Sequence, residues 1–101
     1  MKIIKLIDSP RMKKRFRTYS DDNSKYDFGL KGEGRTYIDH HDKVKRQNYR
    51  RRHYNSVREQ PFIKNIIPSP ALFSYYILWG DSTSIDQNIK ILNKMLKTKD
   101  E

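Results

Sequence analysis

The stretch TYIDHHDKVKRQNYRRRH, residues 36–53, passes from two acids to a dense run of lysines and arginines. A carboxylate at the start of a helix accepts the free N–H groups of the first turn, and cations are favoured near the other end. Asp39 and Asp42 stand at the start of this stretch, and six cations follow them. The charge order therefore predicts a helix over residues 39–53, with Asp39 as its N-cap.

Few apolar residues are available to hold this predicted helix in place. Tyr49 and His53 share one of its faces at a spacing of i, i+4. We expect these two residues and Ile38 to dock the helix onto a core made elsewhere, with five cations projecting outward: Lys43, Lys45, Arg46, Arg50 and Arg51. Residues 43–58 hold seven cations and no acid. This run is either an ordinary solvated face or a surface for a polyanion or an acidic partner.

Charge is distributed unevenly along the 101 residues. Lysine and arginine number 22 against 12 acids, a net charge of +10. Residues 1–58 hold 17 cations and 7 acids, whereas residues 59–101 hold 5 of each. The segregation predicts a basic contact surface followed by a neutral packing segment. We expect a single domain with three parts: a meander with a basic face at 1–35, a basic helix and joint at 36–58, and a neutral helical part at 59–101.

Composition also limits the classes of protein to consider. There is no cysteine, so disulfides and thiolate metal sites are excluded. No apolar run approaches the roughly 18 residues of a membrane span, and the opening MKIIKLID is too short for a secretory signal. We expect neither a membrane span nor a cofactor.

The first third of the chain predicts a small antiparallel meander. Residues 2–8 are rich in isoleucine and leucine, residues 11–20 alternate aromatics with cations, and residues 25–30 carry two aromatics. Met12 and Phe16 would face the core from the second strand, and its opposite face would be wet and basic. Residues 31–35, with two glycines, are read as a flexible connector.

Residues 68–80, PSPALFSYYILWG, predict a second helix over 69–79. Ser69 is a suitable N-cap, Pro70 fits the first helical position, and Gly80 stands where a left-handed C-terminal residue is expected. The segment is apolar nearly all round. It is therefore either a central core helix or a helix partly covered by another molecule, and its core or assembly aromatics are Phe73, Tyr75, Tyr76 and Trp79.

A third helix is predicted over residues 84–96 by apolar residues at helical spacing. These are Ile85, Ile89, Leu92 and Leu96. The tail at 97–101 is expected to fray. The fold class is thus α+β, a three-stranded antiparallel meander followed by helices at 39–53, 69–79 and 84–96.

The string Asp39-His40-His41-Asp42 is where a metal-dependent hydrolase could be sought, since carboxylates and imidazoles bind catalytic metals. Four consecutive residues at a helix start point in different directions, so two at most could share one ion. His53 lies some three turns away. A phosphoesterase family also uses a DHH string, but its further aspartate motifs are missing here. We therefore assign no catalytic residue and no metal ligand.

The candidate contact surface combines cations of the second strand and of the basic helix. Cations interleaved with aromatics can bind phosphates and stack on bases, although strand cations often serve solubility alone. The predicted polyanion or acidic-partner site consists of Arg11, Lys13, Arg15, Arg17, Lys43, Arg46, Arg50 and Arg51.

Several short motifs together resemble a family of small basic proteins of unknown function from nucleocytoplasmic large (giant) DNA viruses. The family pattern has a short β region that ends in an FG-like step, a Y-I-D-H-type helix start, a Y-x-x-R-H helix end and an L-F-S…L-L-W-type helix. Here the corresponding segments are residues 27–29, 37–42, 49–53 and 72–79. The similarity extends over about residues 3–95, and the doubled His40-His41 departs from the pattern.

This resemblance implies a viral setting and carries no assigned activity. We expect a non-enzymatic, virion-associated structural or packaging protein, found in the virion and in the viral factory of the host cytoplasm. Its basic surface would meet an acidic virion protein, and its 69–79 helix could join copies of the chain. The alternative is non-sequence-specific binding of nucleic acid, with DNA favoured over RNA. A metal-dependent hydrolase is a distant third.

Overall fold

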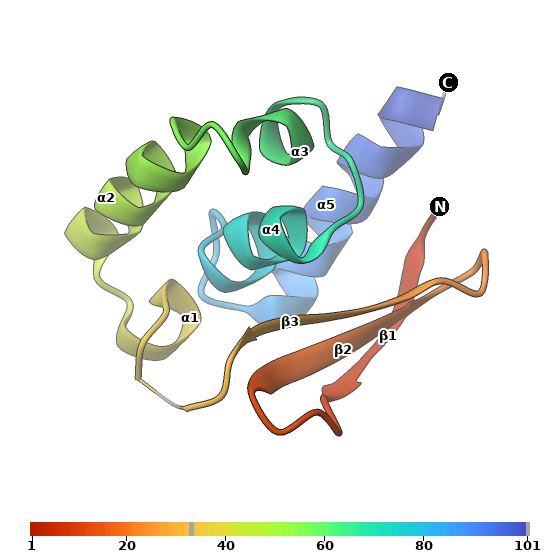
Figure 1. Cartoon of the computed structure of the whole chain (residues 1–101), viewed down its shortest axis with the longest axis horizontal. Coiled ribbons are helices and arrows are strands. Elements are labelled where there is room, and N and C mark those ends of the chain that lie inside the picture. Colours follow the sequence, from red (N-terminus) through yellow and green to blue (C-terminus); the bar gives the residue numbers. More distant parts are fainter. Residues whose placement is uncertain (33, 101) are drawn as a thin grey trace.

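A three-stranded antiparallel sheet opens the chain, as the sequence predicts. In the computed structural model, which describes residues 1–32 and 34–100, the strands are β1 (Ile3–Asp8), β2 (Lys14–Ser20) and β3 (Lys25–Leu30), in the order β1-β2-β3. Figure 1 shows the helices gathered on one side of this sheet. The predicted α+β class is confirmed. Glu33, in the predicted connector, and Glu101, in the predicted tail, lie outside the described residues.

Strand register decides which side chains enter the core. Phe16 lies opposite Phe28 across the β2–β3 pair, and both are buried under the helices. β2 begins three residues later than predicted, because the N–H of Lys14 donates to the carbonyl of Arg11 at 3.3 Å and closes a turn before the strand. Met12, expected to face the core, therefore lies in that turn and is 84% exposed.

The predicted helix at 39–53 is in fact two helices, α1 (Tyr37–His40) and α2 (Lys43–Tyr54). His41 separates them, with a left-handed φ of 58°. The predicted N-cap role of Asp39 is wrong. Thr36 caps α1, and Asp39 sits in its first turn, where the carboxylate accepts the Thr36 N–H at 3.1 Å.

Asp42 is the residue that caps the basic helix. Its carboxylate accepts the N–H groups of Val44 at 3.0 Å and Lys45 at 3.1 Å. The basic helix thus has an acid at its start and arginines in its last turn, as predicted, but it begins after Asp42 and not at Asp39.

The predicted helix at 69–79 begins as expected. α4 (Pro70–Phe73) follows its N-cap Ser69, whose hydroxyl accepts the Leu72 N–H at 3.1 Å. It then widens into the π-helical turn η1 (Ser74–Leu78), which closes with the Trp79 N–H donating to the Ser74 carbonyl at 3.2 Å. Gly80 does not have the positive φ that we predicted. Glycine is needed there for space, because a Cβ would lie 2.2 Å from the Tyr76 carbonyl oxygen.

Two further helices complete the chain. α5 (Ile85–Asp100) confirms the predicted third helix and extends it through most of the tail that was expected to fray. The short α3 (Gln60–Lys64) lies at the start of the neutral part of the chain, at residues where no helix was predicted. None of the described helices has the length and apolar character needed to cross a membrane.

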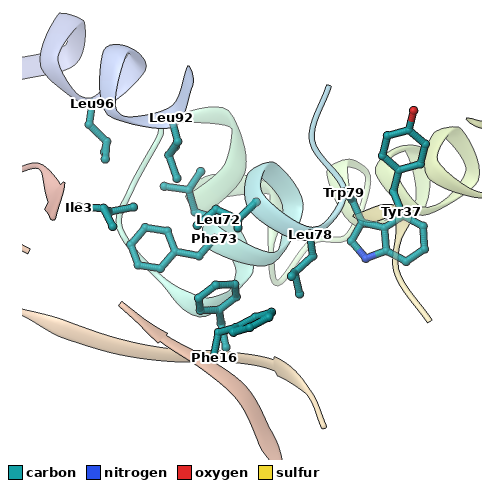
Figure 2. Close-up of a cluster of buried hydrophobic side chains, with 11 residues drawn as sticks. Ile3, Phe16, Tyr37, Leu72, Phe73, Leu78, Trp79, Leu92 and Leu96 are labelled. Carbon is teal, nitrogen blue, oxygen red and sulfur yellow. The ribbon is translucent and has the colours of Figure 1, made fainter. Parts of the chain in front are cut away.

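The core is organised around the α4–η1 segment, which lies between the sheet and α5 (Figure 2). Phe73 meets the rings of Tyr26 and Phe28 edge-on, at centroid distances of 5.1 and 5.9 Å. Leu78 and Leu92, from η1 and α5, are at most 1% exposed. Of the two alternatives for this apolar helix, the central position is the one found. Burying several such large side chains, at about 1.5–3 kcal/mol each, is the main stabilising contribution.

Candidate functional site

Two of the four predicted cations around β2 are engaged inside the molecule. The guanidinium of Arg15 binds the carboxylate of Asp39 through two hydrogen bonds of 2.7 Å. Arg17 forms a similar pair with Asp27, at 2.9 and 3.1 Å. Arg11 and Lys13 remain exposed in the turn before the strand. The predicted wet, basic strand face is therefore replaced in part by two ion pairs.

The Arg15–Asp39 pair fastens the sheet to α1. Both side chains are largely shielded, at 15% and 12% exposure. Hydrogen bonds from Arg15, and further ones from Thr36, hold the pKa of Asp39 well below its usual range. A planar fork of donors matched to a carboxylate fixes orientation as well as distance. Arg15 thus positions the start of the segment that carries the basic helix.

We expect Asp39→Asn to lower the free energy of unfolding by about 2 kcal/mol at neutral pH, because charge-assisted hydrogen bonds are lost. The folded pKa of Asp39 lies below the unfolded value of about 3.9, so its stabilisation is present above that value and is lost as the pH falls. Urea unfolding at neutral and acidic pH measures both effects. The variant should lose less stability on acidification than the parent, whereas Asp86→Asn, at an exposed position of α5, should match the parent. Equal acid sensitivity of Asp39→Asn and the parent would contradict this role.

All four predicted cations of the basic helix lie along one face of α2. Lys43, Arg46, Arg50 and Arg51 line an open groove of about 700 Å³. Gln47, Tyr54, Asn55 and Tyr75 complete its lining. The spacing of three and four residues places these cations on neighbouring turns. We call this feature the α2 groove.

Two of the cations in the α2 groove are held in position rather than projecting freely as predicted. Arg46 donates to the backbone carbonyls of Gly80 and Asp81, each at 3.3 Å. Arg50 pairs with the Asp81 carboxylate at 3.0 Å and lies 4.9 Å from the ring centroid of Tyr75. Carbonyl partners leave the charge of Arg46 uncompensated. The Asp81 side chain is 68% exposed, so its pairing with Arg50 is screened by solvent.

A column of rings connects this helix to the core. Tyr49 stacks on Trp79 at 4.2 Å with an interplanar angle of 5°, and His53 covers the other side of Tyr49 at 3.9 Å. His40 meets Trp79 edge-on at 5.4 Å, and Tyr37 lies 6.4 Å from His40. The docking role predicted for Tyr49 and His53 is confirmed. The contact of Tyr49 with Trp79 was not predicted, although all five rings belong to the sequence motifs at residues 37–42, 49–53 and 72–79.

The four aromatics assigned to core or assembly have different positions. Phe73 is fully buried, Tyr75 is 6% exposed beside the α2 groove, and Trp79 is 9% exposed in the ring column. Tyr76 is half buried next to Tyr75, with ring centroids 4.9 Å apart. Burial raises the pKa of Tyr76 and, more strongly, that of Tyr49.

Residues 39–42 have separate structural roles. Asp39 pairs with Arg15, Asp42 caps α2, and His40 accepts the Asp42 N–H through Nδ1 at 2.9 Å. His41 is exposed in the left-handed link. Within residues 1–32 and 34–100, no three histidine or acidic side chains are close enough together to hold a metal ion.

The fold and its surface define a small α+β protein with a basic groove supported by a ring column. A family of unknown function, DUF5754, matches residues 4–53. The matched segment covers most of the sheet, α1, and α2 up to His53, whereas Trp79 and the rest of the core lie beyond it. No curated protein and no solved structure matches the chain.

Proposed function

We propose that this protein is a non-enzymatic, virion-associated structural protein that binds an acidic protein partner through the α2 groove. The observation that carries the proposal is the gathering of Lys43, Arg46, Arg50 and Arg51 around one groove. No carboxylate is among the described residues that line it. The virion, and the viral factory of the host cytoplasm, are proposed from the resemblance to proteins of large DNA viruses.

The chemistry of the α2 groove favours carboxylates on a folded partner. Arginine forks match carboxylates in two-point contacts, and Arg46 and Arg50 are already oriented by Gly80, Asp81 and Tyr75. Fixed side chains lose less entropy on binding than free ones. Tyrosine and amide groups lie between the cations, and such mixed surfaces are typical of protein–protein contacts.

We expect the double variant Lys43→Gln/Arg51→Gln to bind a fluorescein-labelled decaglutamate peptide about tenfold more weakly at low salt, a loss of about 1.4 kcal/mol. Fluorescence anisotropy measures the affinity. Both residues are exposed, so the fold should be preserved. The matched control is Lys90→Gln/Lys94→Gln on α5, which removes the same charge from exposed positions outside the groove. Equal weakening by the two double variants would show that only net charge matters and would contradict the proposal.

The second candidate is non-sequence-specific binding of nucleic acid. It is favoured by the exposed Lys45 and Arg52 on α2 and by Arg11 and Lys13 in the turn before β2. A short duplex DNA serves as the probe in the same assay. If DNA is the partner, log affinity should fall linearly with log salt by about 0.9 per phosphate neutralised, and the α2 groove double variant should reduce that slope by about two units. Tighter binding to DNA than to the peptide would favour this candidate.

For the virion setting, the protein should be found in purified particles of the virus that encodes it. Mass spectrometry of particles and of infected-cell extract measures its abundance in each. A structural protein should be enriched in particles. Recovery in the extract alone would contradict the proposed location while leaving the binding proposal open to its own test.

A further inference from the structure

A second hollow, of about 620 Å³, lies where the end of β3, the last turns of α2 and the α4–η1 segment meet. It shares no lining residue with the α2 groove. Its lining comes from several elements that are far apart in sequence, so it exists only in the folded chain. We call it the β3–α2 pocket.

The base of the β3–α2 pocket is apolar and rigid. Leu78 is 1% exposed and Trp79 is 9% exposed, and Trp79 is fixed by its stack with Tyr49. These three residues line the pocket together. A flat apolar body could rest there without rearrangement of the core, because close-packed interiors resist change.

Two hydrogen-bonding groups of this base are unused. Neither the indole N–H of Trp79 nor the hydroxyl of Tyr49 makes a hydrogen bond with any of the described residues. Trp79 and Tyr49 both line the pocket. Burial raises the pKa of Tyr49, and its hydroxyl therefore keeps its proton. Both groups can donate to a ligand that carries acceptor atoms.

Three cations are among the residues that line the β3–α2 pocket. Lys14 comes from β2, Arg35 precedes α1, and Arg52 comes from α2. The guanidinium of Arg52 lies 5.9 Å from the ring centroid of Tyr49. Glu59 is the carboxylate among the described lining residues, and it already pairs with His53. Among the described residues, no carboxylate forms an ion pair with any of these three cations, so they can meet a negative group in the pocket.

We propose that the β3–α2 pocket binds a nucleotide, with its base on the Leu78–Trp79 floor and its phosphate among Lys14, Arg35 and Arg52. A nucleobase supplies the flat ring and the acceptor nitrogens that the unpaired Trp79 and Tyr49 donors require. A phosphate supplies the charge that arginine recognises in two-point contacts. The same chemistry is offered by a free mononucleotide and by the phosphorylated end of a strand.

The single tryptophan of the chain reports directly on this pocket. AMP is expected to change Trp79 fluorescence saturably, and calorimetry should give the same affinity. Adenosine and inorganic phosphate, which each supply half of the ligand, should bind at least about tenfold more weakly. A 5′-phosphorylated deoxyadenosine decamer distinguishes the sources: tighter binding of AMP identifies a free nucleotide, and tighter binding of the decamer identifies a strand end.

The variant Arg35→Gln/Arg52→Gln should weaken AMP binding by at least about tenfold. Lys43→Gln/Arg51→Gln is the matched control, since it removes the same charge from the α2 groove, and it should bind AMP as the parent does. Circular dichroism establishes that both variants are folded. No saturable response of the parent to AMP or to the decamer, or equal binding by the two variants, would overturn the proposal.

Discussion

Trp79→Ala is expected to lower the free energy of unfolding by about 3–5 kcal/mol, the usual cost of truncating a large buried aromatic side chain. Trp79 is 9% exposed, stacks on Tyr49 at 4.2 Å and meets His40 at 5.4 Å. α2 has no fully buried residue of its own, so Tyr49 on Trp79 is a principal attachment of the basic helix. The whole free energy of unfolding of a small domain is only about 5–15 kcal/mol. The variant should therefore be largely destabilised.

Thermal unfolding followed by circular dichroism measures this effect without relying on tryptophan emission. Trp79→Phe is the control, because it keeps a ring against Tyr49 and should lose less stability than the alanine variant. An unchanged midpoint in Trp79→Ala, combined with lost self-association in ultracentrifugation, would contradict the core role. It would support the interface between copies that the sequence also allowed for this segment.

Asn88→Ala is expected to lower the free energy of unfolding by about 3 kcal/mol, because it leaves one buried and two partly buried backbone groups without their side-chain partner. The Asn88 amide is 1% exposed and donates to the carbonyls of Ile77 at 2.9 Å and Ser82 at 2.7 Å. Its oxygen accepts the Ser82 N–H at 2.9 Å. The side chain thus joins the end of the π turn to the loop before α5.

Urea unfolding compares Asn88→Ala with Gln87→Ala, a neighbouring exposed position on the same helix. The free energy of unfolding of the control should lie within about 0.5 kcal/mol of the parent value, as is usual for substitutions at exposed positions. Asn88→Asp should also be destabilised at neutral pH, since a carboxylate oxygen would face two carbonyl oxygens. If Asn88→Ala and Gln87→Ala have the same free energy of unfolding, the hydrogen bonds of the Asn88 amide do not stabilise the fold.

The strands were predicted from runs of strand-forming residues bounded by turn residues, although only Phe16 among the three buried residues of β2 is apolar. The sequence predicted α5 well because its apolar residues recur at helical spacing, and Leu92 and Leu96 are buried. It misplaced the start of the basic helix, because Asp39 and Asp42 are equally suitable caps on charge alone. In the structure, Arg15, which is distant in sequence, binds the carboxylate of Asp39, and Asp42 caps the basic helix. A left-handed histidine such as His41 has no sequence signal comparable to that of glycine.

The candidate site was predicted only in part, because helical spacing can be read from the sequence and tertiary pairing cannot. The cations of α2 share a face because helical spacing requires it, and that could be read from the sequence. Which cations are already paired depends on tertiary contacts. The Arg17–Asp27 pair could have been found by aligning the predicted strands, since these residues are direct partners in the register. The β3–α2 pocket had no local signal, because its cations come from three separate segments.

The link between β1 and α5 limits how the chain can fold as it leaves the ribosome. The Asn93 side chain accepts the N–H of Ile3 at 2.8 Å and donates to its carbonyl at 2.9 Å, as a neighbouring strand would. The segment matched by the family, residues 4–53, also lacks Phe73, which packs against Tyr26 and Phe28 of the sheet, and Leu92 of the same core. The early hairpins therefore emerge with an uncovered apolar face, and the native state must be completed only after Asn93 has cleared the exit tunnel.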